Sequence, residues 1–372
     1  MSIAESVERA RPAFGRDVSE GLDALDPLIG RVGLGVGPVR PEGDRVVTSA
    51  LRGYRFEAGS SAGAASATVV RAAVPAAALG ALDAALRESV RYALARELYG
   101  GTVLDIPHAR GLLAAALADA LTADALSSAA VCLADAHAPA ASVAVALSAH
   151  LSCLLLAEAA QQVSVLAGST FYARIAPFEL IEQHVRDLSA LSALVPDLAD
   201  PLPAALDGLG AWCTDAAAPG SLLRPEVVAA IAADAPGAVE VHVALAAAAA
   251  ETAAETREAF DDPHAMLELA HRVSLLTAAA AVVTGWMQAR GSEAIAGDPL
   301  AMEACLRRVH GRVVRRQPRP PPHPVGRRAP QPPPSVSSYL ELVVRLRTAG
   351  SGSREACRRR RAPPGEAAPS RA

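Results

Sequence analysis

From Pro75 onward, apolar residues recur along the chain at spacings of three and four. Leu79, Leu82, Leu86 and Val90 share one side of a helix, and charged residues take the other side (Asp83, Arg87, Glu88 and Arg91). This period is typical of an amphipathic helix that packs against a core. Gly100 and Gly101 predict the end of this first long helix.

The same period continues through three further segments. Asp105 lies before Pro107, which predicts a capped helix start because proline is tolerated in the first turn of a helix. That helix is expected to end near residues 137–142, and two more are predicted over 142–166 and 178–191. Four long helices with short connections predict an antiparallel bundle.

A second helical block is predicted after the proline-containing segment 197–203. Its expected helices cover residues 223–234, 237–260, 262–295 and 298–314. Residues 1–72, in contrast, are rich in glycine, proline and small side chains, with extended candidates at 45–58 and 66–74. We therefore predict a mainly α protein with four parts: a partial β or loop segment (1–72), a helical bundle (73–197), a second helical block (198–314) and a tail (315–372).

The composition supports closely packed helices. Of the 372 residues, 51% are apolar but only 3% are aromatic, so the core has to be built from Ala, Leu and Val. Residues 138–157 carry no charge apart from a possible one on His150, and the run is long enough to span a membrane. We favour a buried core helix over a membrane span, because Glu158 and Gln161 continue the segment as a helix.

Charge is distributed unevenly along the chain. The net charge is −4, yet residues 315–372 are strongly basic and rich in proline, so the part before them is acidic. An acidic folded part argues against nucleic-acid binding. The tail is expected to be disordered. Two origins for it stay open: an evolved anion-binding segment around Arg359, or a GC-rich reading frame that has shifted.

The cysteines and histidines define no metal site or disulfide framework. The five cysteines are widely spaced, with no C-x-x-C pair, which favours a reducing cytoplasm. His264 and His271 lie seven residues apart on one helix face, but no third ligand accompanies them. We therefore expect no metal centre.

Three consecutive motifs resemble the C-terminal helical domain of acyl-CoA dehydrogenases. The first is SATVVRAAVPAAALGALDAALRESVRYA (66–93), the second is RELYGG (96–101), and the third is AEAAQQVSVLAGSTFYARIAPFELIEQHVRDLSAL (157–191). The resemblance implies FAD as cofactor. It implies that Arg96 reaches the FAD pyrophosphate of a neighbouring protomer, that Tyr99 occupies the family's aromatic position, and that Gly168 lets backbone approach the adenosine side.

The chain departs from the family pattern at several positions. Pro107 and Ser164 stand where the family has glutamines that complete the flavin site. Val195 stands where the family's catalytic glutamate follows the Arg-Asp pair, and Asp197 is the nearest acid. Some members take the base from the first helix of this domain, where Glu88 is the candidate, although a solvated helix residue is the simpler interpretation. The catalytic base is therefore left unassigned.

The resemblance implies an acyl-CoA dehydrogenase-like flavoprotein that oxidises an acyl thioester between Cα and Cβ. Because the family's N-terminal domain and most of its β domain have no counterpart in 72 residues, the chain would act as a homo-oligomer, with a partner that supplies the missing domains, or as part of a longer chain. Two alternatives remain: a non-catalytic helical oligomerisation protein derived from the family, and an unrelated all-α protein.

Overall fold

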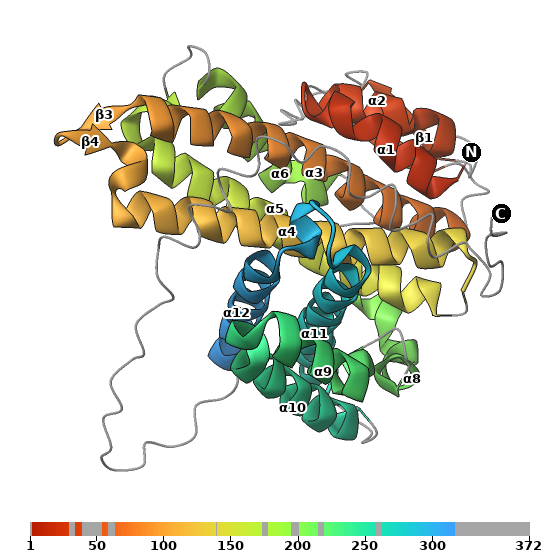
Figure 1. Ribbon diagram of the computed structural model, residues 1–372. Coiled ribbons are helices and arrows are strands. Elements are labelled where there is room, and N and C mark those ends of the chain that lie inside the picture. Colours follow the sequence, from red (N-terminus) through yellow and green to blue (C-terminus); the bar gives the residue numbers. More distant parts are fainter. Residues whose placement is uncertain are drawn as a thin grey trace, which may run out of the picture.

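The computed structural model describes residues 2–29, 34–38, 54–58, 64–138, 140–172, 178–194, 201–214, 219–256 and 262–316. These residues form a mainly α structure in which a bundle of long helices lies across a second helical block (Figure 1). The predicted fold class is confirmed. The tail prediction for residues beyond 316 lies outside the described residues, as does the extended candidate over 45–53.

The prediction of loop or β structure for the N-terminal segment is wrong in part, because two helices form there. Residues Ile3–Phe14 form α1 and Val18–Ile29 form α2, and both pack against α3 (Figure 1). The reason is visible in α1, where Ile3, Val7, Ala10 and Phe14 repeat at helical spacing and are all buried. Ser2 and Glu5 form a reciprocal capping box at its start. A short antiparallel pair, β1 (Leu34–Pro38) and β2 (Tyr54–Ala58), is the extended part of this segment.

The bundle consists of α3 (Ala64–Ala95), α4 (Pro107–Asp135), α5 (Ala141–Ala167) and α6 (Phe178–Leu194). Helix α3 begins earlier than predicted, so the extended structure expected over 66–74 is wrong. Val70 and Val74 suggest a strand by their β-branched side chains, but both are buried in the helix against the core, and tertiary packing overrides that preference. Pro75 lies inside α3.

The second block follows the predicted helices closely. Three longer helices carry it: α10 (Val239–Glu255), α11 (Pro263–Ala289) and α12 (Pro299–Arg316). Shorter elements connect and cover them: η4 (Leu202–Gly208), α8 (Leu209–Thr214), η5 (Pro219–Leu223), α9 (Pro225–Asp234), η6 (Pro236–Ala238) and η7 (Ile295–Gly297).

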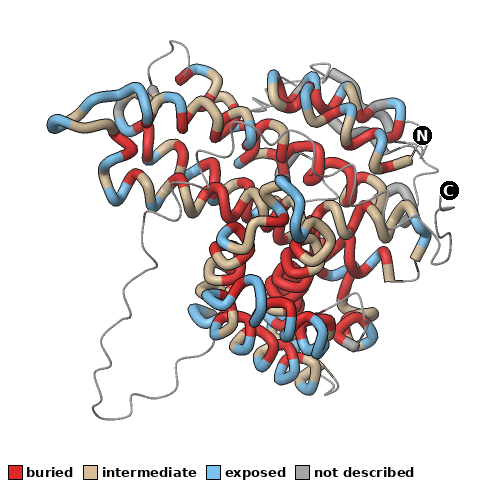
Figure 2. The backbone as a smooth tube through the Cα atoms, viewed as in Figure 1, coloured by how far each residue is buried: buried red, intermediate tan, exposed pale blue. Residues whose placement is uncertain are grey.

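One hydrophobic core runs through both parts of the molecule. It contains side chains from α1 to α6 and from α9 to α12, and the buried stretches of these helices face one another (Figure 2). Trp286 of α11 and Leu126 of α4 belong to this same cluster. The bundle and the second block therefore bury each other's apolar faces.

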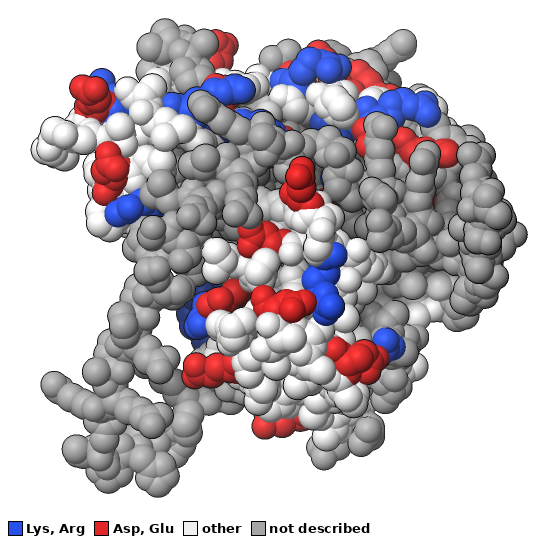
Figure 3. Space-filling view, viewed as in Figure 1, with Lys and Arg blue, Asp and Glu red and all other residues white. Residues whose placement is uncertain are grey.

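Helix α12 is also tied to the bundle by charge. The carboxylate of Asp119 on α4 is fully buried and accepts hydrogen bonds from Arg308 and Arg312 of α12. Arg312 also lies 2.5 Å from Glu158 of α5. On the face drawn in Figure 3, acidic and arginine side chains are interspersed.

Four helices are long and apolar enough to cross a membrane by length and composition. They are α4, α5, α11 and most of α3, and between 56% and 78% of their most apolar windows is buried inside the structure. Helix α5, which contains most of the uncharged run 138–157, packs against α3, α4, α6 and α11. Packing against other helices accounts for the apolar length of α5.

Candidate functional site

A tight hairpin connects α3 to α4 and carries two of the predicted site residues. Its strands are β3 (Glu97–Leu98) and β4 (Gly101–Thr102), and their register leaves Tyr99 and Gly100 as a two-residue turn. Both turn residues have positive φ, 55° at Tyr99 and 85° at Gly100. This combination is the signature of a type I′ turn, in which a tyrosine is unusual.

Tyr99 lies at the tip of this hairpin and is 98% exposed. The hairpin projects from one end of the bundle (Figure 1). An aromatic side chain gains nothing from the core in this position, while its backbone is held in a region that L residues seldom adopt. The turn therefore presents an aromatic surface outward.

Asp105 fastens the hairpin and does not cap α4 as predicted. Its Oδ2 atom accepts hydrogen bonds from the backbone nitrogen and the hydroxyl of Thr102, both at 2.8 Å. The bond from the Thr102 backbone, followed by the one from its hydroxyl, lowers the pKa of Asp105. Helix α4 instead begins at Pro107 after Ile106, with no side-chain cap.

Arg96 lies between α3 and the hairpin, with an exposed side chain. Its backbone is fixed, because its nitrogen donates to Tyr92 and its carbonyl accepts from Val103. Among the residues that the structure describes, its guanidinium forms no ion pair or hydrogen bond. With its backbone fixed and its charge not compensated by a described residue, the planar guanidinium of Arg96 is suited to bind an anion from outside the chain.

Gly168 ends α5 with a φ of 56°. A Cβ built at this position would have nothing within 4 Å, so the space beside the backbone is open. Leu166, two residues earlier, packs with Val103 and Leu104 of the hairpin segment. The structure thus brings Gly168 to the same end of the bundle as Arg96 and Tyr99.

The other residues singled out from the sequence fall in different settings. Pro107 is exposed in the first turn of α4, and the Ser164 hydroxyl donates to the carbonyl of Gln161 within its own helix. Glu88 pairs with Arg91 one turn along α3. Val195 and Asp197 lie outside the described residues, so the structure adds no candidate base.

Two histidines contact each other between helices, and Cys305 is buried in the core. Nε2 of His150 on α5 lies 2.8 Å from Nδ1 of His271 on α11, a contact between bundle and second block that the spacing of His264 and His271 did not indicate. No group of three His, Cys, Asp or Glu side chains among the described residues could hold a metal ion. Burial raises the pKa of the Cys305 thiol to about 12, which keeps it protonated.

The bundle and its hairpin end are similar in sequence to a known protein family. Residues 58–194 match the model of the C-terminal domain of acyl-CoA dehydrogenases. This range contains the whole bundle, the hairpin, Arg96, Tyr99 and Gly168. No curated protein matches the chain.

A solved structure extends the likeness in fold. It is an acyl-CoA dehydrogenase complexed with FAD from Bacillus anthracis, and it is similar to this chain with a TM-score of 0.50 and 14% sequence identity. The match covers 88% of this chain, so the similar fold reaches beyond residues 58–194. The chain in turn covers 62% of the length of that structure. The helical bundle at residues 58–194 is thus similar in sequence to the C-terminal domain of the acyl-CoA dehydrogenase family.

Proposed function

We propose that the chain is a flavoprotein of the acyl-CoA dehydrogenase type that oxidises an acyl thioester between Cα and Cβ, in a reducing cytoplasm. The observation that carries the proposal is the hairpin between α3 and α4. It holds an arginine that has no ion-pair partner among the described residues, on a fixed backbone close to a tyrosine that is 98% exposed. Such groups serve a ligand or partner outside the fold rather than the fold itself.

The residues at this end fit one part of a flavin dinucleotide. Arg96 would hold the pyrophosphate by charge-assisted hydrogen bonds, and the open side of Gly168 would let a ligand come close to the backbone. When bound, FAD would supply the hydride acceptor for the oxidation. Since these groups lie at an exposed end, the remainder of the site would come from a second protomer or from a partner chain.

The chain's own contribution is then positioning. The type I′ turn and the bonds from Thr102 to Asp105 keep the hairpin rigid, so Arg96 and Tyr99 would approach the partner with little loss of entropy. The base that removes the Cα proton is not assigned to a residue of this chain.

A non-catalytic oligomerisation protein is the second candidate, and one observation favours it. Exposed apolar side chains lie near the same end of the bundle. Tyr99 is at the hairpin tip, and three more are each next in sequence to a residue that packs in one cluster with the hairpin segment (Leu94, Val165 and Leu300). An apolar rim of this kind is typical of a protein interface. In this version the hairpin would bind a second copy without a flavin.

Flavin binding separates the two candidates. The purified chain is mixed with FAD, passed over a desalting column and examined for the visible absorption of oxidised flavin, while sedimentation velocity gives its oligomeric state. We expect retained flavin, and about 10- to 100-fold weaker affinity in Arg96→Gln, because a hydrogen bond to a charged group is lost. Arg16→Gln, an exposed arginine paired with Glu20, is the matched control.

A colourless protein that still self-associates would overturn the flavoprotein proposal and support the oligomerisation protein. Equal flavin retention in Arg96→Gln and in the control would show that FAD binds elsewhere. Thioester oxidation is then tested with a series of acyl-CoA chain lengths and an artificial electron acceptor. Flavin binding without turnover would mean that the base comes from another chain.

A further inference from the structure

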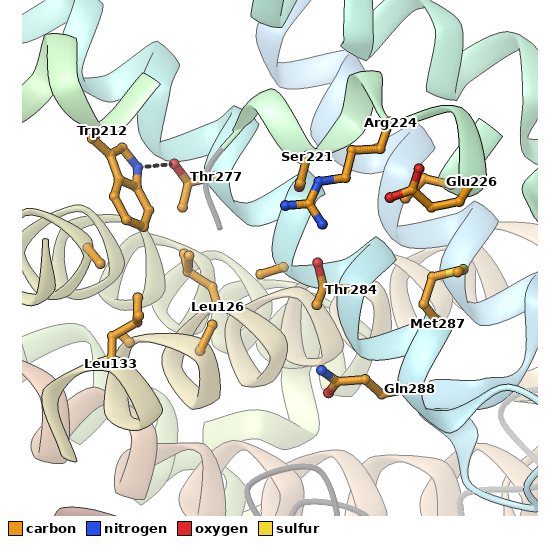
Figure 4. Close-up of a pocket in the computed structure, with 15 residues that line it drawn as sticks. Leu126, Leu133, Trp212, Ser221, Arg224, Glu226, Thr277, Thr284, Met287 and Gln288 are labelled. Carbon is orange, nitrogen blue, oxygen red and sulfur yellow. Dashed lines mark hydrogen bonds between the residues drawn. The ribbon is translucent and has the colours of Figure 1, made fainter. Parts of the chain in front are cut away.

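A cavity lies between the bundle and the second block, away from the hairpin. It has a volume of about 560 Å³ and is lined by α4, α5, α8, η5, α9 and α11 (Figure 4). This volume falls within the range of small-molecule pockets. Its floor on α4 begins at Leu126, roughly 28 Å along the helix axis from Pro107. The cavity is therefore distinct from the hairpin site.

The floor of the cavity is apolar and built from one helix face. Four residues of α4 form a continuous stripe, because Ala129 and Ala130 each lie three or four residues from both Leu126 and Leu133. The two alanines leave room that larger side chains would fill. Opposite them lies Trp212, whose indole nitrogen donates to the Thr277 hydroxyl at 3.0 Å. Such a surface suits a hydrocarbon chain or a ring.

Polar groups gather at the other end of the cavity. The guanidinium of Arg224 points into it, between Ser221 and Thr284, and Gln288 lies one helical turn beyond Thr284 (Figure 4). Ser221 is buried, with only 8% of its surface exposed. The described residues offer no hydrogen-bond partner to the side chains of Ser221, Thr284 or Gln288. Most buried hydroxyls elsewhere on α11 and α4 bond to a carbonyl of their own helix, as Thr277 and Thr122 do.

The charge at this end selects among anions. Arg224 is the one arginine among the lining residues, and Glu226 lines the cavity beside it. Because Glu226 repels any anion and the repulsion grows with the anion's charge, a carboxylate with a single negative charge is favoured over a polyphosphate at this end. Hydroxyl and amide donors from Ser221, Thr284 and Gln288 would complete the shell of a carboxylate.

We propose that this cavity binds an amphipathic monocarboxylate of the fatty-acid class. Its chain lies on the α4 stripe beneath Trp212, and its carboxylate faces Arg224, Ser221 and Thr284. Because the walls come from both the bundle and the second block, an occupant stabilises the packing of the two parts. The proposal is independent of flavin binding at the hairpin.

Tryptophan fluorescence tests the proposal with decanoate as the probe. The chain has two tryptophans, and of these Trp212 is among the residues that line the cavity, whereas Trp286 is not. Decanoate is titrated below its micelle concentration, with 1-decanol as the neutral analogue. We expect a saturable change in fluorescence and a rise in Tm with decanoate, and about tenfold or more weaker binding of decanol.

Variants locate the ligand. Arg224→Gln changes an exposed residue and should reduce decanoate affinity at least tenfold while it leaves decanol unaffected; Arg16→Gln should change neither. Ala130→Phe fills the floor and should abolish binding of both, with circular dichroism as the check on folding. Absence of saturable decanoate binding would overturn the proposal. Equal affinity for decanoate and decanol, or no effect of Arg224→Gln, would overturn the recognition of the carboxylate.

Discussion

Nη2 of Arg308 lies 2.7 Å from Oδ2 of Asp119, a carboxylate with no exposed surface. Arg312 donates to both oxygens of the same carboxylate, at 2.7 and 2.9 Å. Burial disfavours the charged form of Arg312, but hydrogen bonds to Asp119 and Glu158 outweigh this and raise its pKa. Three helices, α4, α5 and α12, are thereby joined around one charge.

Removal of this charge should be costly. Asp119→Asn removes the buried carboxylate that two partly buried arginines share. Arg308 loses this partner and Arg312 keeps Glu158, and we expect a loss of about 3 kcal/mol in the free energy of unfolding. The side chain of Glu158 is 55% exposed, so Glu158→Gln should lower the free energy of unfolding by less than about 1 kcal/mol. Urea denaturation measures both. Similar small losses in the two variants would show that the buried cluster contributes little.

The contact between α1 and α3 depends on a glycine. A Cβ at Gly80 would lie 2.0 Å from the carbonyl oxygen of Arg11, a backbone atom that cannot rotate away. Gly80→Ala should therefore destabilise the protein by about 1–3 kcal/mol despite its better helix propensity. At Gly111 of α4 a Cβ would meet nothing within 4 Å, so Gly111→Ala should stabilise by about 0.5–1 kcal/mol. Thermal unfolding of the two variants should shift in opposite directions.

The start of α1 depends on a carboxylate from α4. Oδ1 of Asp135 accepts from the backbone nitrogen of Ile3 at 2.8 Å, and Oδ2 accepts from Ala4. Asp135→Ala should cost about 1 kcal/mol and raise hydrogen exchange in α1 first, because these donors lose their acceptor. Asp83→Ala removes an exposed carboxylate on α3 and should leave exchange in α1 unchanged.

Stability should fall in mild acid. Burial lowers the pKa of His184 below 6.5, with the Gly15 carbonyl and Asp17 opposing the shift, and burial likewise lowers the pKa of His242. The unfolded chain therefore binds protons first as the pH falls, so these residues contribute stability above about pH 6.5 that is lost as the pH falls through their folded-state pKa values. Nε2 of His184 donates to the carbonyl of Gly15, whereas its buried Nδ1 finds no partner for a second proton in the described part of the chain.

This expectation is checked by measuring the free energy of unfolding from about pH 5 to about pH 8, the range in which histidine titrates. His184→Gln keeps a donor for Gly15 but does not titrate, so the slope with pH should become shallower. His264→Gln replaces a histidine whose side chain is 82% exposed and should leave the slope as it is. A steeper slope in His184→Gln would contradict the assignment.

The helices that the sequence predicted are those with a continuous leucine stripe. The predicted ranges 142–166 and 178–191 agree with α5 and α6 to within a few residues. The start of α3 was predicted wrongly because the valines of 66–74 favour a strand locally, and only their burial in the assembled core makes a helix there. Helices α1 and α2 were missed, although Ser2 and Glu5 form a recognisable capping box.

The hairpin end was located from the sequence, but its geometry was not. Two glycines indicated a turn, whereas the I′ conformation puts Tyr99 rather than a glycine in the first central position. Asp119 could have been noticed, because it stands on the same helical stripe as Ala116, Ala123 and Leu126, where a carboxylate needs a partner. Its two arginines could not have been assigned to it, since no local pattern relates residues so far apart.

The separation of Asp119 from its arginines has a consequence for synthesis on the ribosome. Arg308 follows Asp119 by 189 residues, and Arg312 follows it by 193. While the bundle helices emerge, this carboxylate has no counter-ion, and the face of α4 around it has to stay hydrated. The last described helix is thus the element that closes the bundle, so a nascent chain stalled before α12 should display an open, chaperone-binding intermediate.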